Sequence, residues 1–347
     1  MAWRLLIGIT QNTQTVQAMI HPAIFSTTVR APARLHMGFL DLNGSLGRRF
    51  GSLGLALEEL STGVTARPAD TVSARGPEAE RAAGFARAAL TRLGIDAGAE
   101  IDVERAIPCH AGLGSGTQLA LVVATAIARL YNIEWPLREM ARELSRGGRS
   151  GIGLGLFEQG GFLVDGGRGG QDVPPTVIAR LEFPATWRFV LVFDHSFQGL
   201  HGDQEKQAFA NLPRLTEARS GELCRLALMQ AMPALAERDV RGFGSAITVI
   251  QEIVGDHFAP AQGGRFASPQ VSRALNWLTA QGAAGVGQSS WGPTGFALTD
   301  SETSAHSLAM AARSAFAGDG LEFMVCAGRN QGAEISTQTR AALARAG

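Results

Sequence analysis

A glycine-rich segment between an expected strand and an expected helix carries the residues best suited to chemistry. It reads Pro-Cys-His-Ala-Gly-Leu-Gly-Ser-Gly-Thr-Gln from Pro108 to Gln118. Glycines let successive backbone N–H groups turn toward an anion, and the positive end of the following helix adds to the attraction. The segment predicts a phosphate-binding site made of Gly112, Leu113, Gly114, Ser115, Gly116, Thr117 and Gln118. The alternative is a tight turn with a serine cap.

Arginine must do most of the remaining anion binding. Of the 31 lysine and arginine residues, Lys206 is the single lysine. A phosphate loop of the Gly-Lys-Ser/Thr type is therefore absent, and a Schiff-base mechanism would have to use Lys206. Arginine suits the task because its planar fork bonds phosphate or carboxylate through two N–H groups.

Four residues are the candidate catalytic groups. Arg34 and His36 alternate on one expected strand, so both can face a substrate, although a solvated strand face is the alternative. Arg149 is expected to clamp a phosphate or carboxylate, or else to form a salt bridge within its loop. Asp41 precedes a turn and can be either a site residue or an ordinary turn former.

Further polar residues are candidates for substrate contact: Asn43, Ser150, Gln288, Ser289, Ser290, Trp291 and Asn330. Packing is the alternative for the tryptophan. Cys109 and His110 could suggest a nucleophile and its base, but neighbouring residues on a strand point apart, which argues against cysteine catalysis.

Apolar periodicity indicates which elements position these residues. Strands are expected at 29–37, 53–60, 63–67, 99–107, 161–165, 187–194, 284–287, 295–299 and 321–327. Helices are expected at 77–93, 117–131, 136–144, 203–229, 232–254, 269–281 and 302–316. The stretch 146–155 is expected to be a second loop, rich in glycine and arginine.

Length and composition indicate a globular protein of two domains. The chain has 347 residues, 45% hydrophobic and 18% charged. Glycine and proline cluster at 166–175, which places a boundary near residue 180. The expected parts are a flexible tail at 1–25, an N-terminal domain at 26–180 and a C-terminal domain at 181–347.

Charge and cysteine usage exclude several classes of protein. The formal net charge is zero, which argues against a nucleic-acid surface, and no apolar run is long enough for a membrane span. The cysteines Cys109, Cys224 and Cys326 form no metal-ligand spacing and no set of pairs, which favours a reducing cytoplasm.

The glycine-rich segment resembles the second signature of the GHMP kinase superfamily. That signature reads Pro-x-x-x-Gly-Leu-Gly-Ser-Ser before a helix, and Gly116 stands at the second serine. The N-terminal signature is matched by 31–41 and the C-terminal glycine motif by 285–293. The stretch 150–161 is similar to the Ser-Gly-x-Asp segment of mevalonate kinases, with Gly153 at the catalytic aspartate. Glycine cannot orient or deprotonate an acceptor hydroxyl, so a working kinase is disfavoured, although homoserine kinases manage without that aspartate.

One branch of the superfamily fits further. Five stretches in the right order resemble β-ribofuranosylaminobenzene 5′-phosphate synthases: 34–44, 112–118, 149–153, 287–294 and 330–333. The resemblance runs from about Val29 to the end of the chain. It implies an α+β fold of two domains, an N-terminal ribosomal-protein-like α/β domain and a C-terminal ferredoxin-like domain.

The resemblance also implies a reaction. Phosphoribosyl pyrophosphate would condense with 4-aminobenzoate, or 4-hydroxybenzoate, with loss of CO₂ and pyrophosphate, in methanopterin biosynthesis. It implies Mg²⁺ but neither ATP nor pyridoxal phosphate, and a cytoplasmic homodimer. Candidate metal ligands are Asp165, Asp194 and Glu205, with Asp41 as a further carboxylate. The alternatives are an ATP-dependent small-molecule kinase of the homoserine or mevalonate type, and a ligand sensor without turnover.

Overall fold

Two long antiparallel strands, β1 (Ile24–Asp41) and β2 (Phe50–Ala69), organise the N-terminal half. The computed structural model describes residues 24–170, 173–197, 199, 207–208 and 210–339. The C-terminal part of β2 pairs with β4 (Gly98–Arg105), and its N-terminal part pairs with β5 (Phe162–Asp165). The sheet order is β11-β1-β2-β4-β3, with β3 at Ser73–Arg75, and β6 (Val177–Leu181) pairs with β5.

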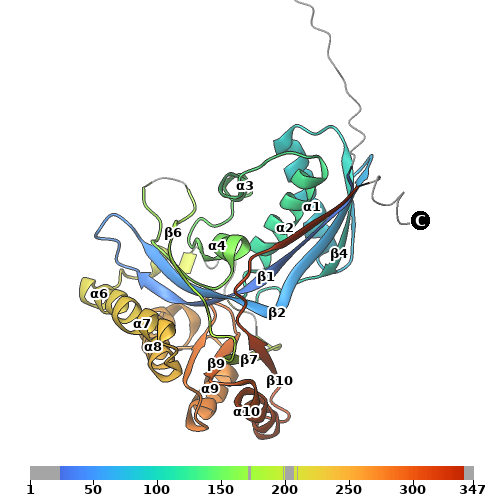
Figure 1. Cartoon of the computed structure of the whole chain (residues 1–347). Coiled ribbons are helices and arrows are strands. Elements are labelled where there is room, and N and C mark those ends of the chain that lie inside the picture. Colours follow the sequence, from blue (N-terminus) through green and yellow to red (C-terminus); the bar gives the residue numbers. More distant parts are fainter. Residues whose placement is uncertain (1–23, 171–172, 198, 200–206, 209, 340–347) are drawn as a thin grey trace, which may run out of the picture.

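Helices α1 (Ala79–Leu93) and α2 (Ser115–Leu130) pack against this sheet, with α3 (Leu137–Glu143) beside them (Figure 1). Helix α2 is apolar on nearly every side, and every residue from Gln118 to Ala128 is buried. A helix that is apolar all round belongs in a core. The start of α2 is therefore held firmly against the sheet.

The C-terminal half holds an antiparallel sheet in the order β10-β7-β9-β8. Its strands are β7 (Arg188–Asp194), β8 (Gly285–Gln288), β9 (Gly295–Thr299) and β10 (Leu321–Ala327). Side chains of β7 alternate between two cores, since Phe189 and Leu191 join one cluster and Val190 and Val192 the other. The first cluster includes α8 (Val240–Gln262), and the second includes α9 (Pro269–Ala280) and α10 (Glu302–Ala315).

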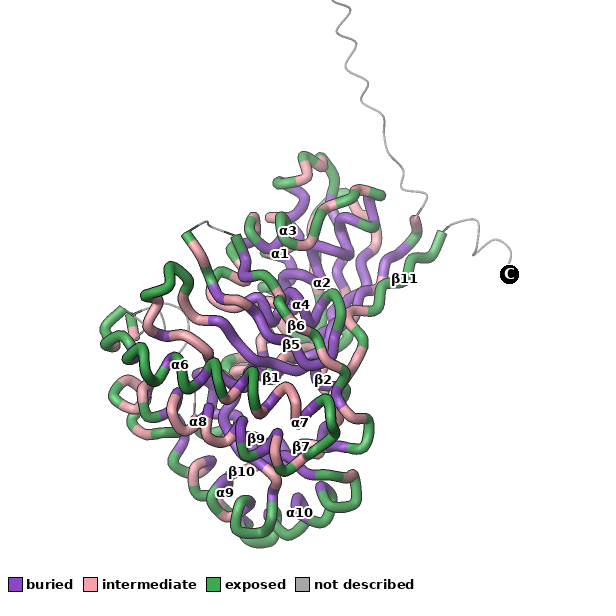
Figure 2. The backbone as a smooth tube through the Cα atoms, turned by 60° about the vertical axis from the view of Figure 1, so that its left-hand side comes forward, coloured by how far each residue is buried: buried purple, intermediate pink, exposed green. Residues whose placement is uncertain are grey.

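The cluster that contains α8 also includes β1 and β2 residues, so the two halves share one core. The remaining helical segments are α6 (Glu217–Leu226), a π-helical turn at Ala227–Ala231, and α7 (Met232–Ala236). In Figure 2 the buried trace runs through the central strands, and exposed residues lie along the outer helices. None of the described helices has the length and apolar content needed to cross a membrane.

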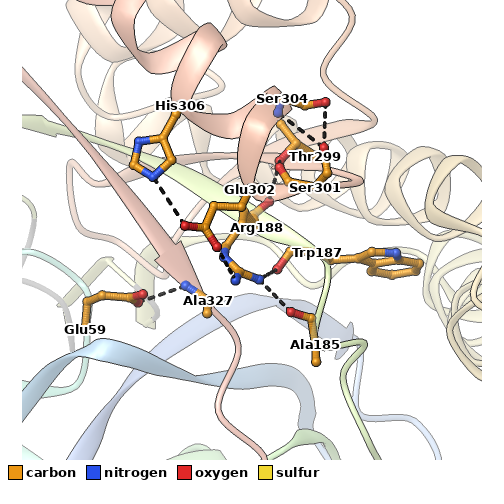
Figure 3. Close-up of polar contacts among 10 residues, drawn as sticks. All are labelled: Glu59, Ala185, Trp187, Arg188, Thr299, Ser301, Glu302, Ser304, His306 and Ala327. Carbon is orange, nitrogen blue, oxygen red and sulfur yellow. Dashed lines mark hydrogen bonds and ion pairs between the residues drawn. The ribbon is translucent and has the colours of Figure 1, made fainter.

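Polar contacts at one end of the C-terminal sheet fix α10 and β10 (Figure 3). Arg188 donates to Glu302 at 2.8 Å and to the carbonyl of Ala185 at 2.7 Å. The backbone N–H of Ala327 donates to Glu59 of β2 at 2.8 Å, which ties the C-terminal sheet to the N-terminal one. These contacts have a structural role.

Several features differ from the sequence-based expectation. The helix expected at 203–229 is interrupted at 212–216 before α6, and the helix expected at 232–254 is divided between α7 and α8. The stretch expected to be loop contains helix α4 (Ile152–Gln159), whose glycines allow close packing: a Cβ on Gly155 would lie 2.6 Å from side-chain atoms of Leu163 and Val177. Strand β6 was not anticipated. The last strand, β11 (Glu334–Thr339), pairs with β1 and so joins the N-terminal sheet rather than the C-terminal domain. Of the tail expected at 1–25, residues 1–23 lie outside the described residues, and residues 24–25 belong to β1.

Candidate functional site

A cleft of about 680 Å³ lies where the glycine-rich segment, the loop before α4, strand β1 and a C-terminal loop meet. Its described lining contains several cationic side chains and no aspartate or glutamate. The basic residues are Arg34, Arg81, Arg146, Arg149 and Arg168, joined by His36 and His110. Such a lining attracts a polyanion.

The glycine-rich segment forms the floor of the cleft as a loop and a helix start. Gly112 and Gly114 have φ of 76° and 80°, the left-handed region that favours glycine. A Cβ on Gly112 would lie 2.1 Å from the Ser289 carbonyl oxygen, so the loop touches the C-terminal half through backbone. Helix α2 begins with no side-chain cap and no acidic residue in its first turn. The N–H groups of Thr117 and Gln118 donate to the Gly114 carbonyl at 3.1 and 3.0 Å, which leaves those of Ser115 and Gly116 at the helix start for an anion.

Most of the residues expected to bind phosphate line the cleft: Gly112, Gly114, Ser115, Gly116 and Thr117. Two do not. Leu113 is fully buried in the core, and Gln118 is buried with its amide donating to the Gly153 carbonyl at 2.8 Å. These two residues support the anion cradle, which is the glycine-rich loop at 112–114 together with the start of α2, from the core side.

Arg81 and Arg146 converge on the start of α2, although the sequence did not single them out as site residues. A Cβ on Gly116 would lie 3.0 Å from Nη2 of Arg81 and 3.6 Å from Nη1 of Arg146. Burial, and then the charge of Arg81, lower the pKa of Arg146, because both effects disfavour its cationic form. The sequence signal for these two arginines is Gly116 itself, which stands where the family signature has a second serine. Glycine leaves room there for the guanidinium groups.

Strand β1 brings Arg34 and His36 to the same cleft, as expected. Arg34 donates through Nη2 to the Gly112 carbonyl at 3.2 Å. The backbone N–H of His36 donates to the Ser289 hydroxyl at 3.0 Å, and this hydroxyl donates to the Gly112 carbonyl at 2.8 Å. Ser289 therefore joins β1, the glycine loop and the C-terminal half through one oxygen.

His36 is held in its neutral form. It is 2% exposed, and its burial, followed by the charges of Arg34 and Arg149, lowers its pKa well below the usual range. Its Nε2 is buried and has no hydrogen-bond partner among the described residues. His36 thus places an uncharged imidazole among the arginines of the cleft.

The loop before α4 contributes Arg149 and Ser150, and Asp165 fixes its shape. Asp165 is fully buried and accepts from the Ser150 hydroxyl at 3.1 Å, from the Gly151 N–H at 2.9 Å and from the Gly167 N–H at 2.8 Å. Burial raises the pKa of Asp165, and these hydrogen bonds oppose that shift. The structure engages both carboxylate oxygens in the loop and places Asp165 outside the cleft lining, contrary to a simple metal-ligand role.

In the C-terminal loop, Ser290 and Trp291 line the cleft, and Trp291 stacks on Phe258 with ring centroids 4.2 Å apart. Gln288 lies behind them and lines a smaller chamber. The tryptophan therefore both packs and faces the cleft.

Several other expected site residues lie elsewhere. Asp41 caps its own turn by accepting from the N–H groups of Asn43 and Gly44 at 2.7 and 3.0 Å. The Asn43 side chain donates to the Leu215 carbonyl at 2.6 Å. Neither Asp41 nor Asn43 is in the cleft lining.

Asn330 and Asp194 also have structural partners. Asn330 accepts from the Phe183 N–H at 2.7 Å and donates to the Phe183 carbonyl at 2.9 Å, which joins two connecting segments away from the cleft. Asp194 accepts from Ser196 and from Ser268 at 2.6 Å each and lies in the C-terminal sheet. Glu205 lies outside the described residues.

Of the carboxylates expected to bind metal, those that the structure describes, Asp41, Asp165 and Asp194, form no metal-binding group. No group of three or more His, Cys, Asp or Glu side chains suited to a metal ion occurs in the described part of the chain. Magnesium commonly keeps waters and takes substrate phosphates as ligands. The described cleft lining offers it hydroxyls at Ser115 and Thr117 but no carboxylate.

Comparison with known proteins gives two family matches. Residues 80–179 match the GHMP kinases N terminal domain, and residues 231–318 match the GHMP kinases C terminal domain. Among solved structures, a homoserine kinase from Cytophaga hutchinsonii has a TM-score of 0.64 at 19% identity, covering 90% of this chain and 97% of its own. A mevalonate kinase has a TM-score of 0.63 at 14% identity, covering 88% and 99%. These neighbours share the fold.

Closer relatives come from curated sequences. The chain is 35% identical over 321 residues to the beta-ribofuranosylphenol 5'-phosphate synthase of Archaeoglobus fulgidus, covering 88% of this chain and 98% of the relative. It is 32% identical over 332 residues to the protein of the same name from Methanothermobacter thermautotrophicus, covering 89% and 98%.

Proposed function

Because this chain belongs to the family of beta-ribofuranosylphenol 5'-phosphate synthases, which is built from GHMP kinase domains, we propose that it is a decarboxylating pentosyltransferase. Its substrates would be phosphoribosyl pyrophosphate and 4-hydroxybenzoate or 4-aminobenzoate. The phenol in the relatives' names favours the hydroxy acid. The products would be the aryl C-riboside 5′-phosphate, CO₂ and pyrophosphate.

One observation carries this proposal: the cleft gathers arginines around an uncapped helix start and has no carboxylate in its described lining. In the proposed reaction, the bond between ribose C1 and the pyrophosphate oxygen breaks, and its electron pair leaves with pyrophosphate. Negative charge on the leaving group would be stabilised by fixed donors already in place, namely Arg34, Arg81, Arg146 and the first N–H groups of α2.

The remaining steps need no proton from the protein. The ring carbon that bears the carboxylate attacks the cationic ribose C1 and forms the new carbon–carbon bond. The bond to the carboxylate then breaks, CO₂ departs, and the electron pair restores the aromatic ring. This balance is consistent with a site in which His36 is neutral and whose described lining lacks an aspartate or glutamate.

The family's kinase chemistry fits this cleft less well. Gly153, at the position of the kinase aspartate, lies in the first turn of α4, and a Cβ there would lie 3.3 Å from the Thr117 methyl group. A carboxylate at that point could reach the start of α2, whereas glycine leaves the position without an acid or base.

The direct test supplies purified protein with phosphoribosyl pyrophosphate, Mg²⁺ and each aryl acid, and follows CO₂ and pyrophosphate. We expect equal amounts of both products, and no ADP when ATP and small alcohols are supplied instead. Transfer of a γ-phosphoryl group to a hydroxyl, with no CO₂ from either acid, would refute the proposal.

Three further properties are proposed with the function. Mg²⁺ would arrive with the pyrophosphate group rather than in a carboxylate cage, so chelation should reduce turnover without unfolding the protein in circular dichroism.

A homodimer predicts twice the chain mass in sedimentation equilibrium. A cytoplasmic location is supported by cysteines that form no disulfide in the structure, and recovery in a membrane or secreted fraction would contradict it.

A further inference from the structure

A small chamber opens beside the main cleft, on the side of α8. It has a volume of about 20 Å³, which is enough for about one water-sized group. Its lining includes the apolar side chains of Phe39, Val254 and Phe258, the amides of Gln251 and Gln288, and the guanidinium of Arg265. No aspartate or glutamate is in this described lining.

The chamber and the cleft share a wall of aromatic side chains. His36, Phe39 and Ser290 line both spaces. The His36 and Phe39 rings have centroids 4.6 Å apart, and Phe39 meets Phe258 edge-on at 5.9 Å. With Trp291 stacked on Phe258, this junction offers flat apolar surfaces of the kind on which another aromatic ring packs well.

The polar groups of the chamber are held in fixed orientations. Gln288 accepts from the Ala267 N–H at 2.7 Å and donates to the Ser290 carbonyl at 3.0 Å. Its backbone N–H donates to the Gln251 side chain at 2.8 Å. At the junction, the buried Nε2 of His36 has no partner among the described residues, which is the condition expected of an atom that awaits a ligand.

We propose that the chamber receives the para substituent of an aromatic monocarboxylic acid whose ring lies against the His36, Phe39 and Trp291 wall. This inference rests on the proposed function, and it adds a size limit that the function does not require. A hydroxyl or amino group matches a water-sized space, whereas a methoxy or methylamino group exceeds it. The acid's carboxylate end then faces the arginine-lined cleft, where the ribose carbon would lie.

The test compares para-hydroxy with para-methoxy benzoate, and para-amino with para-methylamino benzoate, as substrates with phosphoribosyl pyrophosphate. One extra methyl group in a close-fitting pocket typically changes kcat/KM by about 10- to 200-fold. We expect the wild type to prefer the smaller acid of each pair by a factor in that range. Val254→Ala removes two methyl groups from the chamber wall and should reduce the preference by about tenfold or more.

Val249→Ala is the matched control, because it makes the same change on the same helix at a residue outside the chamber lining. Its preference should equal that of the wild type. The chamber assignment is wrong if the wild type uses the methylated acids as well as the parent acids, or if the two alanine variants change the preference equally.

Binding separates this inference from the function. Calorimetric titration with the same four acids should give the same order of affinities without turnover. If no acid releases CO₂ but the order of affinities and its loss in Val254→Ala persist, the function fails and the chamber assignment stands. If the protein releases CO₂ without discriminating between the larger and smaller acids, the function stands and the chamber assignment fails.

Discussion

Replacing Arg146 by methionine should weaken binding of pyrophosphate and yet leave the free protein as stable or more stable. The guanidinium lies near Gly116 at the start of α2, beside Arg81, and over the Phe85 ring with 5.1 Å from Cζ to the centroid. Methionine keeps an unbranched side chain against that ring and removes only the charge and the hydrogen-bond donors.

The two effects have opposite signs for a physical reason. Without an anion, burial and the charge of Arg81 both disfavour the cation, as the lowered pKa of Arg146 indicates. With pyrophosphate bound, the same cation makes a charge-assisted hydrogen bond, a type that contributes about 1.5–3 kcal/mol. Since about 1.4 kcal/mol is a factor of ten, the dissociation constant should rise by about ten- to a hundredfold.

The assay is calorimetric titration with inorganic pyrophosphate, with urea unfolding of the free protein alongside. Arg142→Met is the control, because Arg142 lies on the neighbouring α3 and its ion pair with Glu143 is on the surface. Surface pairs of this kind contribute little. Unchanged pyrophosphate affinity in Arg146→Met, or a clear loss of stability in the free protein, would refute the reasoning.

Three further predictions concern the frame of the site. His36→Gln should make the free energy of unfolding less dependent on pH in the acid range. In the wild type, the lowered pKa of His36 means that the unfolded state takes up a proton before the folded state does. The free energy of unfolding of the wild type therefore falls as the pH drops below about 6.5, by up to about 1.4 kcal/mol per pH unit. Urea unfolding at pH 7.5 and 5.5 measures this, and an equal slope in both proteins would contradict it. Gly155→Ala should destabilise by about 1–3 kcal/mol because its Cβ would lie 2.6 Å from two side chains, whereas Gly84→Ala, with nothing within 4 Å on an exposed helix face, should stabilise by up to about 1 kcal/mol. Thermal unfolding of the two variants should therefore shift in opposite directions. Asn330→Ala should cost about 1–3 kcal/mol by leaving the Phe183 backbone groups unpaired while KM for each substrate stays unchanged, and a raised KM would instead support a substrate contact.

Local patterns in the sequence predicted much of the cradle. The glycine spacing at 112–116, followed by a long apolar run, correctly placed a loop and a helix start. Alternation on β1 correctly placed Arg34 and His36 on one side. These features are local, since they depend on backbone freedom and on side-chain periodicity within a few residues.

The rest depended on contacts between distant segments. Arg81 lies in the first turn of an ordinary amphipathic helix, and only the approach of α1 to α2 reveals its role. Asp41 and Asn330 look the same in sequence whether they bind a ligand or pair with a neighbouring backbone, and in the structure both side chains accept hydrogen bonds from backbone N–H groups. Helix α4 was expected to be a loop because its glycines are helix-breaking by propensity, and tertiary packing overrides that preference.

The Ser289 oxygen that joins β1 to the glycine loop has a consequence for how substrates reach the cleft. A hinge that swung the two halves apart would break two hydrogen bonds at this atom and pull Gly112 away from a backbone it already touches. The anion cradle and the C-terminal half should therefore move as one piece. A destabilising substitution in the C-terminal sheet would then appear first as weaker binding of pyrophosphate, before the protein unfolds.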